Sequence, residues 1–166
     1  MFKLNKFLAL LGKERIVALA TLGKIGSLKA PGTFGSLAGI LFFTVALFYA
    51  SLPALVLYSL VSAYIAVGVC DLAESYIGVK DPHEVILDEF VAIPFCFWGI
   101  PLNFEGAGNF IIVALAFGLF RLFDITKPLF INKLQELKGG LGCVADDIAA
   151  ALTTCVCLHV IIKLFM

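Results

Sequence analysis

The sequence predicts an all-α protein that crosses a membrane with about five helices and places its polar loops on the cytoplasmic side. Apolar residues make up 61% of the chain and the mean hydropathy is +1.06, whereas soluble domains contain about 45–50% apolar residues. No residue between Lys29 and Asp71 is charged, and this stretch is long enough for two membrane helices. Six basic residues up to Lys29 stand against one acid, Glu14, which predicts a cytoplasmic N-terminus.

The chain, residues 1–166, is expected to form one membrane-embedded domain. Its formal net charge of zero gives no reason to expect a nucleic-acid partner. Residues 1–26 alternate basic and apolar positions, which predicts an amphipathic segment lying at the cytoplasmic surface. The five cysteines have neither CxxC pairs nor a zinc-binding spacing, so we expect them to be buried and reduced.

A loop rich in glycine and hydroxyl groups, residues 24–36, leads into the apolar run 37–50. A loop of this kind at a helix N-terminus presents free N–H groups that suit a phosphate. Alternatively, Gly35 and Gly39 form a small-xxx-small pair that lets another helix approach closely. Composition favours the packing role, but both interpretations stay open.

The next apolar runs predict a helical hairpin followed by a second pair of crossings. Ser51 and Pro53 interrupt the first run and predict the hairpin turn. The expected segments are 54–77 returning to the cytoplasm, 90–100 leaving it, a turn at 101–109, and 110–120 coming back. Several of these segments are shorter than the ~20 residues of a straight crossing, so some helices are expected to lie only partly in the bilayer.

The stretch between residues 80 and 90 predicts an acidic helix in apolar surroundings. Asp81 resembles an N-cap, with Pro82 at the first helical position and Glu84 behind it. The helix would then carry Glu84 and Asp88 on one face, although like charges four residues apart repel each other. Because unpaired carboxylates are costly among apolar side chains, we expect a cation here, and a divalent ion with oxygen ligands is the simplest candidate.

Charged residues also mark the last two helices. Arg121, Asp124 and Lys127 recur every third residue and share one helical face, which Pro128 ends. An amphipathic piece at 129–138 and a glycine-rich break at 139–142 follow, and Asp146-Asp147 is expected to open the final helix, 148–166. On this threading seven of the twelve acids gather at the cytoplasmic helix ends. Together with the basic residues and the glycine-rich loop, they suggest metal-assisted chemistry on a phosphate carried in the membrane.

Four ordered motifs resemble those of the phosphatidylglycerophosphatase A family. They are Lys29-Ala-Pro-Gly-Thr-Phe-Gly-Ser-Leu37, Ile86-Leu-Asp-Glu-Phe-Val91, Phe120-Arg-Leu-Phe-Asp-Ile-Thr-Lys-Pro128 and Gly139-Gly-Leu-Gly-Cys-Val-Ala-Asp-Asp147. The resemblance implies an all-helical, Mg²⁺-dependent enzyme of the bacterial inner membrane. Such an enzyme hydrolyses phosphatidylglycerophosphate to phosphatidylglycerol and phosphate during phospholipid biosynthesis. The sequence departs from the family pattern at Ala92, where Gly is frequent, and at Phe130, where Pro is frequent.

These motifs give each candidate site residue an expected role. The expected Mg²⁺ ligands are Glu84, Asp88, Glu89, Asp146 and Asp147. The expected catalytic residues are Asp88, Asp124, which orients or deprotonates the attacking water, and Lys127. The expected substrate-binding residues are Lys29, Thr33, Ser36, Arg121 and Lys127. Direct attack by water is preferred to an aspartyl-phosphate intermediate, because the haloacid-dehalogenase, cysteine-phosphatase and phosphohistidine signatures are missing.

The main alternative is a small transporter or ion-pathway protein, because intramembrane acids also mark such pathways. A transporter predicts ionisable groups near the middle of its spans and often repeat symmetry, and the sequence shows neither. A CDP-alcohol phosphotransferase would need an Asp-Gly-Ala-Arg signature, which is absent. A homo-oligomer is possible. His83 is expected in a solvated loop, and His159 is expected to be hydrogen-bonded rather than a metal ligand.

Overall fold

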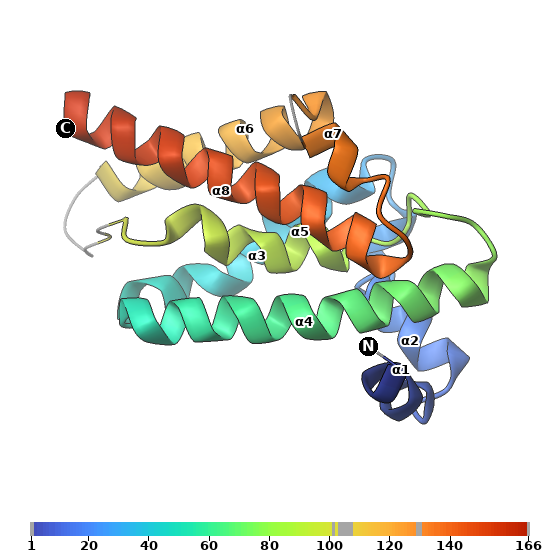
Figure 1. Cartoon of the computed structure of the whole chain (residues 1–166). Helices are drawn as coiled ribbons and strands as arrows, with labels where there is room; N and C mark the ends of the chain where they lie inside the picture. Colours follow the sequence, from blue (N-terminus) through green and yellow to red (C-terminus); the bar gives the residue numbers. More distant parts are fainter. Residues whose placement is uncertain (1, 101, 103–107, 129–130, 166) are drawn as a thin grey trace.

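The protein is a bundle of α-helices without strands in the part of the chain that is described (Figure 1). The structure is a computed structural model that describes residues 2–100, 102, 108–128 and 131–165, without the side chains of residues 2, 3 and 44–49. Its elements are α1 (Phe2–Ala9), α2 (Lys13–Ala20), η1 (Ile25–Ser27), α3 (Pro31–Tyr49), α4 (Leu52–Ile77), α5 (Leu87–Ala92), η2 (Ile93–Phe97), α6 (Gly108–Thr126), α7 (Ile131–Leu134) and α8 (Gly140–Phe165). The predicted all-α class is confirmed.

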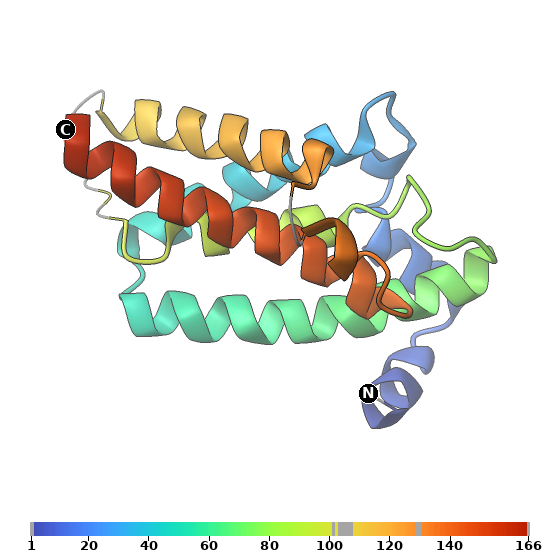
Figure 2. The ribbon, with the colours of Figure 1, turned by 45° about the horizontal axis from the view of Figure 1, so that its top comes forward.

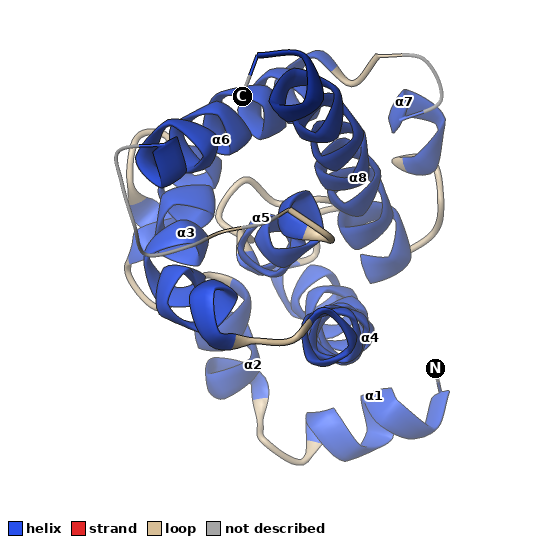
Figure 3. Cartoon of the chain, turned by 90° about the vertical axis from the view of Figure 1, so that its left-hand side faces the viewer, coloured by secondary structure: helices blue, strands red, loops and turns tan. Residues whose placement is uncertain are grey.

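The short α5–η2 segment lies in the centre of the bundle. In the view along the bundle, α3, α4, α6 and α8 surround α5 (Figure 3). Every residue from Val91 to Phe97 is buried, so this segment supplies much of the core. Figure 2 shows the long helices running along a common axis, with the C-terminus at one end and α1 and α2 near the other. The acidic start of α5 faces the end that carries α1 and α2.

Three described helices are long and apolar enough to cross a membrane, namely Leu52–Ile77, Asn109–Thr126 and Gly140–Phe165. The described part of α3, Pro31–Phe43, is a shorter apolar helix. Large apolar side chains such as Leu57, Tyr64 and Phe110 are exposed on these helices, as expected of surfaces that face lipid. The protein is therefore a helical membrane protein, and its described residues give three candidate spans where the sequence predicted about five.

The predicted third crossing, 90–100, has a different role. It forms the six residues of α5 and the five of η2, which are too few for a span of ~20 residues. The interruption at Ser51–Pro53 is confirmed, because α3 ends at Tyr49 and α4 begins at Leu52. The predicted turn at 101–109 falls mostly outside the described residues.

The N-terminal amphipathic segment is two short helices rather than one. Gly12 separates α1 from α2 with a φ of 83°, a backbone conformation that glycine adopts without steric cost. In α1, Asn5 Nδ2 donates to Asp71 Oδ2 of α4 at 2.6 Å. The side of this segment that contacts α4 is thus fixed by a polar contact as well as by apolar packing.

The expected helix start at Asp81 is wrong, because α5 begins five residues after Pro82, at Leu87. Asp81 has a φ of 49°, which no helical N-cap requires. The N–H of Ile86 donates to the Ala20 carbonyl at 2.9 Å, so it is not available for a helix that starts at Pro82. Contact with α2 therefore holds residues 82–86 in an irregular path, and Glu84 does not share a helical face with Asp88.

The expected start of the last helix is also wrong, because α8 begins at Gly140. The Gly140 N–H donates to Asp71 Oδ1 of α4 at 3.3 Å, so the helix is capped by a residue distant in sequence. A Cβ at residue 140 would lie 2.2 Å from the Val67 carbonyl oxygen, which explains the glycine. Asp146 and Asp147 consequently lie about two turns inside α8, not at its start.

The glycine pair of α3 packs against α5. A Cβ at Gly35 would lie 3.0 Å from Ile86 Cβ, and one at Gly39 would lie 2.7 Å from Ile93 Cγ1. This geometry confirms the packing interpretation. The cysteines are free, and four of the five are buried, as predicted.

Candidate active site

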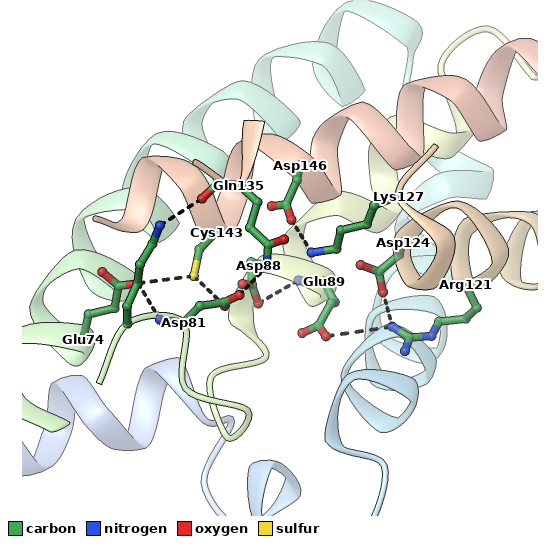
Figure 4. A network of polar contacts seen from close by, with 11 residues as sticks. Glu74, Asp81, Asp88, Glu89, Arg121, Asp124, Lys127, Gln135, Cys143 and Asp146 are labelled. Carbon is green, nitrogen blue, oxygen red and sulfur yellow. Dashed lines mark hydrogen bonds and ion pairs between the residues drawn. The ribbon is translucent and has the colours of Figure 1, made fainter. Parts of the chain in front are cut away.

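A cavity of about 250 Å³ lies at one end of the bundle, where α3, the loop before α5, α5, the end of α6 and α8 meet. Its charged lining consists of Asp81, Asp88, Glu89, Arg121, Asp124, Lys127, Asp146 and Asp147. Figure 4 labels these residues except Asp147 and shows their side chains converging from separate elements. A larger hollow of about 570 Å³ adjoins it through Asp81 and His83. The smaller cavity is the candidate site because most of the acids and both basic residues line it.

Three acids in the cavity are close enough to share a metal ion. One carboxylate oxygen each from Asp88, Glu89 and Asp147 lies within 4.8 Å of the others. Asp88 and Asp147 are each only 4% exposed. Mg²⁺ binds oxygen at about 2.0–2.1 Å, so ligands on opposite sides of the ion lie about 4 Å apart and small adjustments would close this set around it.

Unpaired oxygen atoms support this fit. Glu89 Oε2 and Asp146 Oδ1 are buried and have no hydrogen-bond partner. A buried polar atom without a partner costs about 1–3 kcal/mol, and more when it is charged. A cation would remove that cost. The residues present therefore fit a hard divalent ion such as Mg²⁺.

Two basic side chains hold the other acids. Arg121 Nη1 lies 2.6 Å from Asp124 Oδ2 and 3.8 Å from Glu89 Oε1. It also donates to Ser36 Oγ at 3.4 Å, so Ser36 lies behind the arginine and orients it. Lys127 forms an ion pair with Asp146. Both basic groups therefore reach the cavity with their positions fixed by acids.

Burial shifts the titration of the acids on α5. Burial raises the pKa of Asp88 to about 7. The pKa of Glu89 is also raised, by burial first and then by the charge of Asp88. Both pKa shifts mean that the buried surroundings disfavour the anionic forms of the Asp88 and Glu89 carboxyl groups. A cation beside them would reverse that preference.

Lys127 shows the opposite balance. Its burial alone would lower its pKa, but the hydrogen bond to Asp146 and the charges of Asp146, Asp147 and Asp124 outweigh burial and raise it. Lys127 is therefore a fixed positive charge at the edge of the acid cluster. It follows the last helical residue of α6, Thr126, and has a φ of 41°, a conformation often found at functional sites.

The first turn of α3 completes the cavity. Gly32 and Thr33 line it, and the N–H groups of a first helical turn have no acceptor within their own helix. A Cβ at residue 32 would lie 2.2 Å from Glu89 Oε1, so only glycine leaves that carboxylate its place. Gly35 and Gly39 thus provide the packing and Gly32 leaves room for Glu89, whereas phosphate binding by this loop stays a prediction.

Most of the expected site residues meet in this cavity. Those that line it are Thr33, Asp88, Glu89, Arg121, Asp124, Lys127, Asp146 and Asp147. Ser36 is buried one layer behind. Glu84 and Lys29 are exposed and do not line the cavity. Glu84 is excluded because the helix expected to bring it beside Asp88 does not form.

Sequence reasoning missed three polar side chains that line the cavity, those of Asp81, His83 and Cys143. Asp81 was interpreted as a helix cap, and only the fold turns it toward Asp88. Cys143 lies three residues before Asp146, and this helical spacing could have indicated a shared face. His83 is exposed in its loop as predicted. His159, also as predicted, forms a hydrogen bond, with its Nε2 3.0 Å from the Trp98 carbonyl oxygen.

Comparison with known proteins agrees with this arrangement. The family model of phosphatidylglycerophosphatase A matches residues 18–162. The chain belongs to the phosphatidylglycerophosphatase A family. The match includes all eight charged residues that line the cavity. No solved structure is significantly similar to the chain.

Relatives from several bacteria cover most of the chain. A phosphatidylglycerophosphatase A from Haemophilus influenzae is 32% identical over 125 residues, which are 74% of this chain and 73% of the relative. One from Escherichia coli is 34% identical over 135 residues, 79% of this chain and 73% of the relative. A protein of Bacteroides thetaiotaomicron named as a candidate phosphatidylinositol-3-phosphatase is 34% identical over 129 residues, 73% of this chain and 76% of the relative.

Family membership confirms the resemblance seen in the sequence. It also confirms the expectation of an enzyme, a phosphoric monoester hydrolase. The transporter alternative is not favoured. The bacterial relatives and the three apolar helices agree that this is a membrane protein.

Proposed function

We propose that this protein hydrolyses the phosphomonoester of a membrane lipid, with phosphatidylglycerophosphate as the substrate and phosphatidylglycerol and phosphate as the products of a step in phospholipid biosynthesis. The observation that carries the proposal is the meeting of buried acids with Arg121 and Lys127 in one cavity. Acids alone would repel a phosphate, and basic residues alone would not bind a metal ion. The names of the two phosphatidylglycerophosphatase A relatives support this choice of substrate.

Asp88, Glu89 and Asp147 would hold Mg²⁺, because their oxygens already lie within 4.8 Å of one another. When bound, Mg²⁺ neutralises charge on the phosphate oxygens and lowers the pKa of a bound water. Asp146, which the sequence placed among the ligands, holds Lys127 through Oδ2, while its Oδ1 has no partner and lies outside this group of three. Glu84 lies outside the cavity.

The basic side chains provide the positive charge that a phosphate dianion needs. Arg121 and Lys127 flank the cavity from the end of α6, and each is fixed by a carboxylate. Fixed donors of this kind stabilise charge in the transition state without reorganising during the reaction. Thr33 and the amide of Gly32 also line the cavity, with Gly32 next to Arg121, and they can donate to the remaining phosphate oxygens.

Asp124 orients the attacking water. It is buried, its carboxylate is held by Arg121, and it lines the cavity between the two basic residues. The water oxygen bonds to phosphorus while the ester bond to the headgroup oxygen breaks. One water proton passes through Asp124 to the departing oxygen, which leaves as the alcohol of the lipid product.

The assay is phosphate release from phosphatidylglycerophosphate by the purified full-length protein, with and without Mg²⁺. We expect release only with Mg²⁺. Phosphatidylinositol 3-phosphate is the comparison substrate, because one relative carries the name of a phosphatase for that lipid. Faster hydrolysis of the inositol lipid would replace the proposed substrate, and release from neither lipid would contradict the proposed function.

We further propose that the protein lies in the bacterial inner membrane as a multi-pass protein with its N-terminus and its site on the cytoplasmic side. The basic residues before residue 30 support this orientation. Single cysteines at Ser27, Lys138 and Ser51, in a background without the native cysteines, test it because all three positions are exposed. A membrane-impermeant thiol reagent applied to intact cells should label only the cysteine at residue 51. Labelling at residue 138 from outside would contradict the proposed orientation.

A further inference from the structure

Asp88 belongs to a second group of donor atoms on the side of the cavity next to the loop before α5. One carboxylate oxygen of Asp81, one of Asp88 and the Sγ atom of Cys143 lie within 4.8 Å of one another. Asp88 and Cys143 are 4% and 6% exposed. The Cys143 thiol donates to Asp81 Oδ1 at 3.2 Å. Figure 4 shows Cys143 and Asp81 next to each other, on the side of the network away from Arg121.

A separate observation is that another acid of the same cavity, Asp146, has an oxygen without a partner. Asp146 follows Cys143 by three residues on α8, so both side chains lie on the same helical face. Asp146 is 2% exposed, and its Oδ1 has no partner although its Oδ2 binds Lys127. Asp146 and Cys143 line the same cavity. A buried carboxylate oxygen left unpaired in the cavity that Asp81, Asp88 and Cys143 also line is an available metal donor.

The positions of these donors suit a metal ion. Bonds of about 2.3 Å to sulfur and 2.0–2.2 Å to oxygen place the donor atoms of a tetrahedral zinc ion about 3.5 Å apart, so side-chain adjustments of about 1 Å would close this group around the ion. Gln135 Nε2 donates to Asp81 Oδ2 at 2.9 Å, which leaves Oδ1 directed at the thiol. A ligand held through its second oxygen in this way is typical of built metal sites.

We propose that Asp81, Asp88 and Cys143, with Asp146 Oδ1 as a fourth donor, form a second cation site that takes a borderline-soft divalent metal such as Zn²⁺. A thiolate ligand favours such metals over Mg²⁺. Asp88 would bridge the two sites, because it also belongs to the Asp88–Glu89–Asp147 group. Metal binding replaces the hydrogen bond from Cys143 to Asp81 and releases the thiol proton to solvent. This inference goes beyond the proposed function and shares Asp88 and Asp146 with it.

Cobalt titration tests the site directly. The full-length protein, stripped of metal in detergent, is titrated with Co²⁺, whose bond to a thiolate produces a charge-transfer absorption in the near ultraviolet. We expect this absorption to saturate at one equivalent per chain and to be lost in Cys143→Ser. Cys157→Ser is the matched control, because Cys157 lies on the same helix but outside the cavity, and it should keep the absorption. Absence of the band from the unmodified protein, or its persistence in Cys143→Ser, overturns the proposal.

Two further variants show whether loss of the absorption reflects misfolding, and they distinguish the two metal sites. Asp81→Asn keeps every sulfur, and we expect it to bind Co²⁺ at least about tenfold more weakly. Asp147→Asn changes only the Mg²⁺ group and should keep the band. Unchanged Co²⁺ affinity in Asp81→Asn, or loss of the band in Asp147→Asn, counts against the second site.

Phosphate release with Mg²⁺ is measured on the same preparations. Hydrolysis without any cobalt–thiolate band overturns the second site and leaves the proposed function standing. A normal cobalt–thiolate band without hydrolysis of either lipid supports the second site and contradicts the proposed function.

Discussion

The two pairs of adjacent acids in the site, Asp88–Glu89 on α5 and Asp146–Asp147 on α8, are divided in the same way. One member of each pair binds a basic side chain, Glu89 to Arg121 and Asp146 to Lys127. Among the ion pairs of the described residues, none involves Asp88 or Asp147. Adjacent helical residues point about 100° apart, so an acidic pair on a helix can serve two purposes at once.

The two members of each acidic pair therefore have different roles: one holds a basic side chain and the other has no basic partner. Glu89 and Asp146 hold the basic groups that line the cavity. Asp88 and Asp147 are equally buried but unpaired, and burying an unpaired charge costs much more than burying a paired one. On the proposed mechanism the unpaired members bind the metal ion. The paired members position Arg121 and Lys127, and Glu89 also contributes an oxygen to the metal group. The following predictions test this division, starting with the largest effect.

Asp88→Asn should have the largest effect, because it removes charge from an unpaired member while keeping its shape. The loss of several kcal/mol of metal-based stabilisation corresponds to a fall of about 10³-fold or more in the rate of phosphate release. Glu84→Gln is the matched control, since Glu84 is exposed outside the cavity, and it should retain activity. A near-normal rate for Asp88→Asn would mean that the unpaired acids are structural.

Lys127→Ala removes the basic side chain that Asp146 holds, and we expect the second-largest effect from it. The loss of one fixed positive charge near the phosphate is expected to lower kcat by roughly 10²–10³-fold, without raising the Mg²⁺ concentration needed for half-maximal activity. Lys133→Ala, a change of an exposed lysine on α7, should have no effect. A large increase in the Mg²⁺ requirement of Lys127→Ala would show that Lys127 organises the metal ligands instead.

Gly32→Ala should displace Glu89 without changing any charge. The added methyl group would lie 2.2 Å from Glu89 Oε1, and a shift of about 1 Å in a catalytic group can cost up to about 10²-fold in rate. We expect a fall of about 10–100-fold in phosphate release. Gly118→Ala on α6, where an added Cβ meets nothing within 4 Å, should behave as the unmodified protein. Equal rates for the two variants would show that the position of Glu89 is unimportant.

The smallest effect is on stability against pH. Burial raises the pKa of Asp88 to about 7 without metal, whereas an unfolded aspartate titrates at about 3.9. Between these values the folded state binds more protons than the unfolded state, so the free energy of unfolding falls as the pH rises. Chelator-treated protein should therefore unfold at lower temperature at about pH 7 than at about pH 5, and Mg²⁺ should stabilise it more at the higher pH.

Thermal unfolding followed by intrinsic fluorescence measures this, and Asp88→Asn should show a weaker pH dependence. A stripped protein that becomes more stable as the pH rises through this range would contradict the assignment of Asp88 as an unpaired buried acid.

Sequence alone determined the class of the protein and much of its site. The apolar runs and the break at Ser51–Pro53 indicated the membrane helices. The spacing of Arg121, Asp124 and Lys127 predicted a charged face at the end of α6, and all three line the cavity. These features depend on local periodicity and on transfer of apolar surface from water, which a sequence carries explicitly.

Only the tertiary structure decided where two helices begin and which residues join the site. Ala20 accepts the Ile86 N–H, and Asp71 accepts the Gly140 N–H, so the starts of α5 and α8 depend on partners more than sixty residues away in sequence. These contacts exclude Glu84 from the cavity and bring in Asp81 and Cys143. They also make the third apolar run a central core segment instead of a crossing. The free N–H groups at the start of a helix need an acceptor, and a local capping side chain or a distant element satisfies them equally well. Once the chain has packed, only the distant acceptor is within reach, so it decides where the helix begins.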